Sequence, residues 1–495
     1  MKELEKFYEE YKDVQRHYQL ALSTMYYDIA TIAPKKGVPA RNQAMTFLSG
    51  EAFTKATDPQ SLQKIEQLGE QTQDMLLKKE IQLLLKELES NRALPKDVYM
   101  AFQQAIHDSE ASWEQAKLEQ NYSLFEPHLQ DLIQKQKEGL TYMNKQASDY
   151  DTLLDRYQEG MNTKAYDAFF ASIKQHLVPL IQEIAKRQSA FCDDALKKSF
   201  DIPTQKAYHS QLLNYFQMDK GCCILGETQH PFTEFFSAHE ARITTHFYEH
   251  DVIDPILSTI HEYGHAQYDL QVRSEFDGTA LKNGIGFAMH ESQSRLMENH
   301  IGRNRALWEV QLPVLQTYFP QLKGITLDDF MNMINISKPS LIRTAADELT
   351  YPLHILIRYE MEKEIFDGNG SLEQLNERWK DKYEQYLGIR PNHDAEGILQ
   401  DMHWGAANFG YFPTYALGSA YAAQMYHSMT SQLDVDTALR NNQFYLIRDW
   451  LKENIHQYGA SLTADEILRR ATGEAFNPAY YIEYLTTKYK TLYQL

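Results

Sequence analysis

The sequence predicts a mainly α-helical protein with a small β element, built as one large body. Apolar residues recur three and four positions apart with charges between them, as in QDMLLKKEIQLLLKELES (73–90), which is the pattern of amphipathic helices. Glycine, β-branched and aromatic residues gather in one central stretch, near residues 218–249. The 495 residues contain no repeat period, low-complexity tract or glycine-serine linker, so nothing marks a clean domain boundary.

Taken in order, residues 1–220 are predicted to form consecutive helices. We predict turns between them at Asp58-Pro59, Leu94-Pro95 and Glu126-Pro127. The segment ARITTHFYE (241–249) predicts a strand of a small sheet. After Pro255 the pattern returns to helix and stays mostly helical to Leu495, apart from loops near residues 367–371 and 388–394. We expect an N-terminal part, residues 1–220, and a second part, residues 221–495, in one continuous domain.

Composition excludes some classes of partner. Hydrophobic residues make up 43% and charged residues 24%, which is ordinary for a globular protein with a sizeable core. The formal net charge of -19 disfavours nucleic acid and anionic lipid, because both require stripes of Lys and Arg. The acidic balance is otherwise explained by a solvated surface.

Cysteine usage and the N-terminal residues predict a location. The three cysteines, Cys192, Cys222 and Cys223, have no CxxC or zinc-ribbon spacing, which favours a reducing compartment. The first residues, MKELEKFYEEYKD, alternate charges where a secretory signal needs an apolar stretch, and no apolar run reaches 18 residues. We therefore expect a cytoplasmic protein with no membrane segment.

The segment ILSTIHEYGHAQYDL (256–270) contains His-Glu-x-x-His, and Pro255 and the apolar residues before the first histidine predict a helix there. On a helix, His261 and His265 lie one turn apart on the same face, so two imidazole nitrogens can reach one metal ion. Glu262 is rotated about 100° from His261, close enough to take a proton from the attacking water without being a ligand. The pattern alone also fits a helix with two surface histidines.

A catalytic zinc needs a third protein ligand and an open position for water. The segment GFAMHESQSRLMENHIGR (286–303) predicts a second helix, on which Glu291 and Glu298, seven residues apart, share a face. Either glutamate closes a His-His-Glu site. We favour Glu291, because it lies nearer the apolar start of the helix, whereas the polar neighbours of Glu298 are typical of an ion pair. Imidazole combined with carboxylate favours one Zn²⁺ per chain, with Co²⁺ as a substitute.

Beyond these two segments, three more motifs follow in a defined order. The full series is EARIT (240–244), HEYGH (261–265), HESQ (290–293), IRTAAD (342–347) and GILQDMHW (397–404). It resembles the signature set of the carboxypeptidase Taq family of zinc metallocarboxypeptidases, which is D-x-R-x-T, H-E-x-x-H, H-E-S/G-Q, I-R-x-x-A-D and G-x-x-Q-D-x-H-W. Four of the five motifs match at every defined position. HPFT (230–233) and YFPTYALG (411–418) are also similar to it, and the resemblance covers essentially the whole chain.

The resemblance implies a role for each matching residue around the metal. His261 and His265 match the family's zinc histidines, and Glu291 matches its third ligand. Glu262 matches its catalytic glutamate. Asp269, four residues after His265, either orients a ligand imidazole through a hydrogen bond or is a solvated carboxylate on the helix surface.

The resemblance also implies residues that hold the substrate. Arg343 matches an arginine that holds the free C-terminal carboxylate, and a planar guanidinium suits that task. His403 and Tyr415 match residues that stabilise the tetrahedral oxyanion. From the residues alone, an ion pair between Arg343 and Asp347 on one helix face, and core packing of His403 and Tyr415, remain open.

One motif departs from the family. Where the family has Asp-x-Arg-x-Thr, this chain has Glu240 before Arg242, which keeps the carboxylate but lengthens its stem by one methylene. We expect the charge pairing with Arg242 to survive with shifted geometry. Arg242 remains a candidate for positioning the substrate, and the change affects cleavage preference rather than metal binding.

The activity implied by the resemblance is release of single C-terminal amino acids from peptides with a free C-terminus. The fold implied is neurolysin-like (gluzincin), in which the helices of residues 1–220 form one wall of a deep central groove and the metal helices form its floor. Extended peptides, rather than folded proteins, are then the partners. A homodimer is implied by the resemblance alone.

Two other functions remain as alternatives. A thimet-type oligoendopeptidase shares a mostly α fold and a His-Glu-x-Gly-His helix, and only IRTAAD and GILQDMHW favour the carboxypeptidase. A non-catalytic metal- or peptide-binding relative is the second alternative. Glu262 argues against it, because a binding protein does not need a base at that position.

Overall fold

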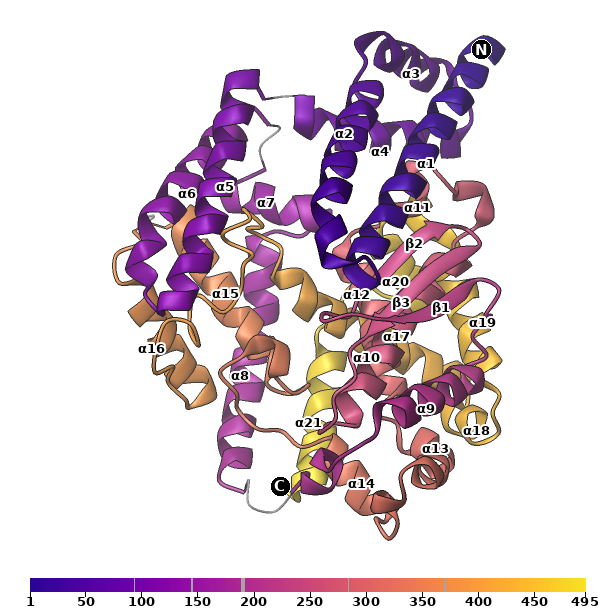
Figure 1. Cartoon of the computed structure of the whole chain (residues 1–495), viewed down its shortest axis with the longest axis vertical. Helices are drawn as coiled ribbons and strands as arrows, with labels where there is room; N and C mark the ends of the chain where they lie inside the picture. The colour runs from indigo at the N-terminus through magenta and orange to yellow at the C-terminus, as the bar shows by residue number, and fades with distance from the viewer. Residues whose placement is uncertain (93, 144–145, 188–191, 284, 369–370) are drawn as a thin grey trace.

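The computed structural model describes residues 1–92, 94–143, 146–187, 192–283, 285–368 and 371–495 (Figure 1). Consecutive helices make up the first part of the chain, as the sequence predicts. They are α1 (Lys2–Thr31), α2 (Val38–Ala56), α3 (Pro59–Gln71), α4 (Met75–Arg92), α5 (Lys96–Glu119), α6 (Glu126–Leu140), α7 (Asp149–Tyr157), α8 (Thr163–Ala185) and α9 (Ile202–Tyr215). Helices α1 and α2 lie side by side at one end of the molecule, and α5 packs along α6 (Figure 1).

The three predicted turns coincide with helix starts. Pro59 is the first residue of α3, and the side chain of Asp58 accepts a hydrogen bond of 2.8 Å from the backbone N–H of Ser61. An aspartate cap followed by proline satisfies a free N–H and presets the first backbone angle, so the helix begins there. Helix α5 begins directly after Pro95, and α6 begins at Glu126.

A three-stranded sheet follows the first helices. Strands β1 (Cys223–Glu227), β2 (Thr233–Ser237) and β3 (Glu240–Thr245) lie in the order β1-β3-β2, with β3 parallel to β1 and antiparallel to β2. The predicted strand is confirmed, although it ends at Thr245. Helix α10 (Ile253–Gln271) packs against β3, which explains why Ala241 and Ile243 are fully buried.

The rest of the chain is again mostly helical. Its helices are α11 (Ala280–Asn283), α12 (Phe287–Arg295) with a π-helical turn (Leu296–Ile301), α13 (Arg305–Tyr318), α14 (Leu327–Ile334), α15 (Tyr351–Phe366), α16 (Leu375–Leu387), α17 (Pro413–Gln432), α18 (Val435–Arg440), α19 (Phe444–Asn454), α20 (Ala464–Thr472) and α21 (Ala479–Tyr493). The loop predicted near 388–394 is confirmed as the start of a longer segment, 388–412, without α-helix. Part of the loop predicted at 367–371, residues 369–370, lies outside the described residues.

The hydrophobic core joins segments that are distant in sequence. One continuous cluster of buried residues extends from Ala116 to Tyr493, and within it α8 packs against α21 near the C-terminus (Figure 1). A smaller cluster, which includes Tyr8, Leu62 and Ile81, joins α1, α3 and α4. Within the described ranges, no helix combines the length and apolarity needed to cross a membrane.

Candidate metal centre and active site

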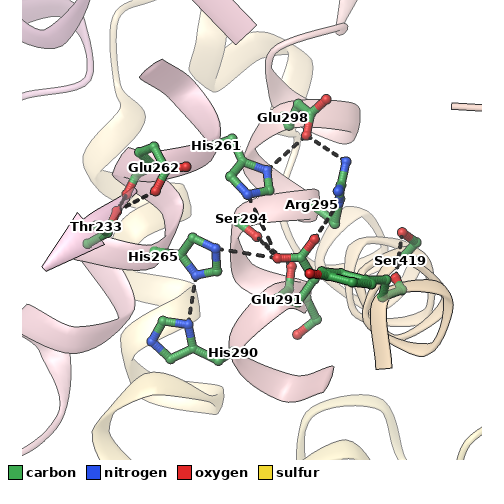
Figure 2. Close-up of polar contacts among 12 residues, drawn as sticks. Thr233, His261, Glu262, His265, His290, Glu291, Ser294, Arg295, Glu298 and Ser419 are labelled. Atoms are coloured by element: carbon green, nitrogen blue, oxygen red, sulfur yellow. Dashed lines mark hydrogen bonds and ion pairs between the residues drawn. The ribbon is translucent and has the colours of Figure 1, made fainter. Parts of the chain in front are cut away.

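Two neighbouring helices bring two imidazoles and one carboxylate together. His261 and His265 lie on α10 and Glu291 lies on α12, and their candidate ligand atoms are all within 4.8 Å of one another. Oε2 of Glu291 is 3.8 Å from Nε2 of His261 and 3.4 Å from Nε2 of His265 (Figure 2). The three side chains are therefore directed toward a common point.

Two glycines allow the helices to approach this closely. A Cβ atom at Gly264, inside the His-Glu-x-x-His motif, would lie 2.7 Å from the backbone oxygen of Gln293 and 2.7 Å from Cα of Ser294 on α12. A Cβ atom at Gly418 on α17 would lie 2.9 Å from Cγ of Glu291. Any side chain at either position would separate its helix from α12, and the position of Glu291 depends on both contacts.

The negative charge of Glu291 is stabilised by its neighbours. Its Oε1 accepts a hydrogen bond of 2.7 Å from Nε of Arg295, and its Oε2 accepts one of 3.1 Å from Oγ of Ser294. Burial alone would raise the pKa of Glu291, but Arg295 and the imidazoles of His261 and His265 hold this pKa well below its usual range. An ionised carboxylate is what a cation site requires.

Glu298 occupies a different position. Its Oε2 accepts hydrogen bonds from Nδ1 of His261 at 2.9 Å and from Nη1 of Arg295 at 3.0 Å (Figure 2). Burial opposes ionisation, but Arg295 and His261 lower the pKa of Glu298 to about 2. Of the two glutamates that the sequence left open, the structure places Glu291 in the cluster and Glu298 behind His261, where it fixes the imidazole with Nε2 free.

His265 is supported by another histidine. Its Nδ1 lies 2.7 Å from Nδ1 of His290, and Nε2 of His290 lies 3.2 Å from Oδ1 of Asp269. The sequence left open whether Asp269 contacts a ligand imidazole or solvent. The structure shows that Asp269 is buried and contacts His290, so it reaches His265 only through that ring.

Glu262 lies beside the cluster, and one of its carboxylate oxygens is directed at Thr233 of the sheet (Figure 2). Oγ1 of Thr233 on β2 lies 2.7 Å from Oε2 of Glu262 and 2.9 Å from its backbone oxygen. The carboxylate is therefore held beside the three candidate ligands without joining them, which is the position that a base for a water molecule needs.

Arg343 belongs to a second polar group. Its Nε and Nη2 donate to Oδ1 of Asp401 at 3.0 and 2.9 Å, and Oδ2 of Asp401 accepts a hydrogen bond of 2.7 Å from Nε of Arg358. Nη1 of Arg343 donates to the hydroxyl of Tyr351 at 3.2 Å. Burial would raise the pKa of Asp401, but the two guanidinium groups hold it well below its usual range. Asp401 thus fixes the guanidinium of Arg343 along the edge formed by Nε and Nη2.

The sequence left open an ion pair between Arg343 and Asp347, and that interpretation is wrong: each side chain has other partners. Arg343 begins a short 3-10 turn (Arg343–Ala345), so the two side chains do not share the face of an α-helix. Asp347 instead accepts hydrogen bonds from the backbone N–H of Lys338 at 2.9 Å and from Oγ1 of Thr350 at 2.8 Å.

His403 and Tyr415 lie beside Arg343. Cζ of Arg343 is 5.2 Å from the centroid of the Tyr415 ring, and the His403 ring is 6.3 Å from the Tyr415 ring. Burial and the nearby guanidinium groups lower the pKa of His403 to about 4, and burial raises the pKa of Tyr415. Both side chains are therefore neutral near pH 7.

Tyr351 connects the two groups. Its ring centroid is 4.8 Å from Cζ of Arg295, the partner of Glu291, and its hydroxyl accepts the hydrogen bond from Arg343. A chain of direct contacts thus leads from the His-His-Glu cluster to Arg343. His403 and Tyr415 lie at the Arg343 end of this chain of contacts.

Arg242 lies with the sheet. Its Nε donates to Oε1 of Glu240 at 2.8 Å, and its guanidinium carbon lies 4.2 Å from the ring centroid of Phe236 and 5.0 Å from that of Tyr27. The expected charge pair between residues 240 and 242 is therefore present, despite the longer glutamate side chain.

The fold and this cluster define a class of protein. The two histidines of a His-Glu-x-x-His helix, a glutamate from a second helix and a carboxylate beside them that is not a ligand are the parts of a metallopeptidase. The donor set fits a divalent cation, because the imidazole nitrogens and the ionised carboxylate converge.

Within that class, the chain belongs to the carboxypeptidase Taq (M32) metallopeptidase family, whose model matches residues 7–489. Carboxypeptidase 1 of Bacillus subtilis (strain 168) is 40% identical over 483 residues, covering 97% of this chain and 96% of the relative. Thermostable carboxypeptidase 1 of Thermus thermophilus is 33% identical over 482 residues, covering 94% of each chain. The crystal structure of the M32 carboxypeptidase from Deinococcus radiodurans R1 superposes with a TM-score of 0.95 at 29% identity, covering 98% of each chain. The chain is accordingly a metal-dependent carboxypeptidase, a peptide hydrolase.

Several contacts of the site could not be predicted from the spacing of residues in the sequence. Thr233 is the last residue of the HPFT stretch, which only the resemblance to the family indicated as part of the site. His290 and Arg295 lie in the second metal segment, but their partners lie on other turns or another helix. Tyr351 could not be found, because no spacing rule connects it to Arg295 and Arg343.

Proposed function

We propose that this chain holds one Zn²⁺ ion between His261, His265 and Glu291 and releases single amino acids from the C-termini of peptides. The observation that supports this most is the convergence of the three ligand atoms within 4.8 Å, beside a carboxylate that stays outside the set. Imidazole and carboxylate donors without a thiolate favour zinc, with cobalt as a substitute. When bound, such an ion polarises the scissile carbonyl and makes water a stronger nucleophile.

Glu262 is proposed as the general base. It accepts a proton from the attacking water and passes it to the leaving amine, which is the work of a carboxylate with one free oxygen. Thr233 restrains Oε2 at 2.7 Å, so Oε1 is the oxygen available for that transfer.

Arg343 is proposed to bind the substrate's terminal carboxylate. Asp401 occupies its Nε and Nη2 edge, so Nη1, next to the hydroxyl of Tyr351, is the donor available to an incoming carboxylate. His403 and Tyr415, neutral and beside Arg343, are proposed to donate hydrogen bonds to the oxyanion. Arg242, fixed by Glu240 and two aromatic rings, is proposed to contact the substrate from the side of the sheet.

The order in which products appear tests this proposal. A peptide with a free C-terminus should lose one residue at a time, and its C-terminally amidated copy should react far more slowly, as followed by mass spectrometry over time. Internal cleavage of both peptides at equal rates would support the thimet-type oligoendopeptidase instead. Binding without cleavage would support the non-catalytic relative.

The remaining features of the proposal concern partners and place. We infer that helices α1–α9, in residues 1–220, form one wall of a deep groove that admits extended peptides. The net charge of -19 supports small peptides rather than nucleic acid or anionic lipid as partners. A homodimer in the cytoplasm is part of the same proposal, and light scattering of the purified protein tests the dimer.

A further inference from the structure

The two candidate histidine ligands have different hydrogen-bond partners at Nδ1. A ligand imidazole needs a partner for its far nitrogen, because that partner fixes the tautomer and the orientation of the ring. His261 has a carboxylate, Glu298, at 2.9 Å. His265 has another imidazole, that of His290, at 2.7 Å, with the two ring planes 22° apart and the centroids 4.6 Å apart.

The hydrogen positions in this second arrangement follow from the condition that His265 binds a cation. Nε2 of His265 faces Glu291, so it binds a cation only if the proton of His265 is on Nδ1. His265 then donates to Nδ1 of His290. His290 in turn carries its proton on Nε2 and donates it to Oδ1 of Asp269 at 3.2 Å. When His265 holds a cation, this assignment gives each of the other three ring nitrogens a partner, and the series ends on a carboxylate.

The carboxylate at the end of this series is itself fixed. Asp269 is 7% exposed, and the side chain of Lys282, 2% exposed, donates to the backbone oxygen of Asp269 and lies 4.1 Å from the ring centroid of Phe235. Burial would raise the pKa of Asp269, but His290 and Lys282 hold it below its usual value. A buried cation thus lies next to an aspartate that has no direct contact with the cluster.

We propose that His290 is a positioning residue that couples His265 to the charge of Asp269 and so sets how tightly the metal ion is held. The inference rests on the metal site of the proposed function. It assigns His290 a role distinct from that of its neighbour Glu291, although the two residues are adjacent in the HESQ motif. His290 touches neither the substrate nor the ion, and it acts only through His265.

Two substitutions of His290 distinguish coupling through hydrogen bonds from simple packing of the ring against His265. His290→Leu removes both nitrogens, whereas His290→Gln keeps one acceptor and one donor in series. We expect His290→Leu to lower zinc affinity about 10- to 100-fold in competition with a chromophoric chelator. The visible absorption of the Co²⁺-substituted protein should shift in His290→Leu and remain close to that of the parent in His290→Gln.

Asp269→Asn extends the test without changing side-chain volume, and it serves in place of His290→Leu if leucine impairs folding. It should weaken zinc binding less than His290→Leu does. Combining the two substitutions should add nothing further, because residues that act in series are not additive. His427→Leu is the matched control: this exposed histidine on α17 lies against the ring of Tyr480, and the variant should bind zinc like the parent.

The outcomes are distinct. Parental zinc affinity and an unchanged cobalt spectrum in His290→Leu would overturn the inference, as would equal losses in His290→Leu and His290→Gln. Failure of the parent protein to bind one zinc per chain would instead overturn the proposed metal site. Melting temperatures of the metal-free proteins, measured alongside, show whether any loss of affinity comes from the fold.

Discussion

The two halves of the site are built differently. The metal half lies on regular helices, with His261 and His265 one turn apart on α10 and Glu291 on α12. The half that is proposed to hold the substrate, around Arg343 and His403, lies on two irregular segments, 335–350 and 388–412. In the first half, helix geometry fixes each side chain relative to its neighbours in sequence. In the second, position depends on contacts between distant segments, such as that of Arg343 with Asp401.

This contrast predicts that chemistry and substrate selection separate by mutation. Glu262→Gln should lower kcat at least about 1,000-fold, because the base is lost. Zinc content should stay near one per chain, because Glu262 is held by Thr233 outside the ligand set. Steady-state kinetics and metal analysis of the same preparation provide the check. Retained activity would remove Glu262 from the mechanism, and lost zinc would make it part of the metal site.

The second prediction concerns the irregular half. Arg343→Ala should lower kcat/KM for peptides with a free C-terminus by roughly 100- to 1,000-fold, mainly through KM, because a buried charged hydrogen bond is lost. Amidated peptides should be affected much less. Arg343→Lys is the matched control: it keeps a positive charge opposite Asp401 but lacks the separate Nη1 donor that is proposed to hold the substrate's carboxylate while Nε and Nη2 pair with Asp401. An equal loss on free and amidated peptides would argue against the proposed role of Arg343.

The sequence predicted these two halves with unequal success, for a physical reason. The period of an α-helix relates His261 to His265, and the close packing of α12 at Gly264 and Gly418 brings Glu291 beside them. No comparable rule relates Arg343 to Asp401, which is 58 positions away, and the helical rule pointed wrongly to Asp347. Only the likeness to family motifs marked Arg343.

The irregular half also depends on one buried acid. Glu362 on α15 is fully buried and accepts hydrogen bonds of 2.8 Å from Oη of Tyr150, Nε1 of Trp404 and the backbone N–H of Gly410. It therefore ties the segment that carries His403 to α7 and α15. Burial outweighs these three donors and raises the pKa of Glu362 to about 7.

The third prediction follows from that shift. The pKa of Glu362 is about 7 in the folded chain and about 4.3 in the unfolded chain, so the folded state binds the proton more tightly. Its contribution to stability is fully present below about pH 4.3 and is lost as the pH rises through about 7, by roughly 4 kcal/mol in all. Because Glu362→Gln removes this titration, the difference in free energy of unfolding between the metal-free parent and variant should fall with rising pH. Urea titrations measure it, and a constant difference would contradict the shift.

The smallest effect is expected at the sheet, where the chain departs from its family. Glu240→Asp restores the family's residue but shortens the carboxylate that contacts Nε of Arg242 at 2.8 Å. The guanidinium stays stacked on Phe236 and Tyr27, so we expect only a few-fold change in kcat/KM, with a different ranking of peptides that vary in their last two residues. Zinc affinity should not change, because none of these residues belongs to the metal cluster. Arg242→Lys, which keeps the charge but loses the planar stacking, is the control. If Glu240→Asp left the ranking intact while Arg242→Lys altered it, the arginine alone would set the preference and the extra methylene would be neutral.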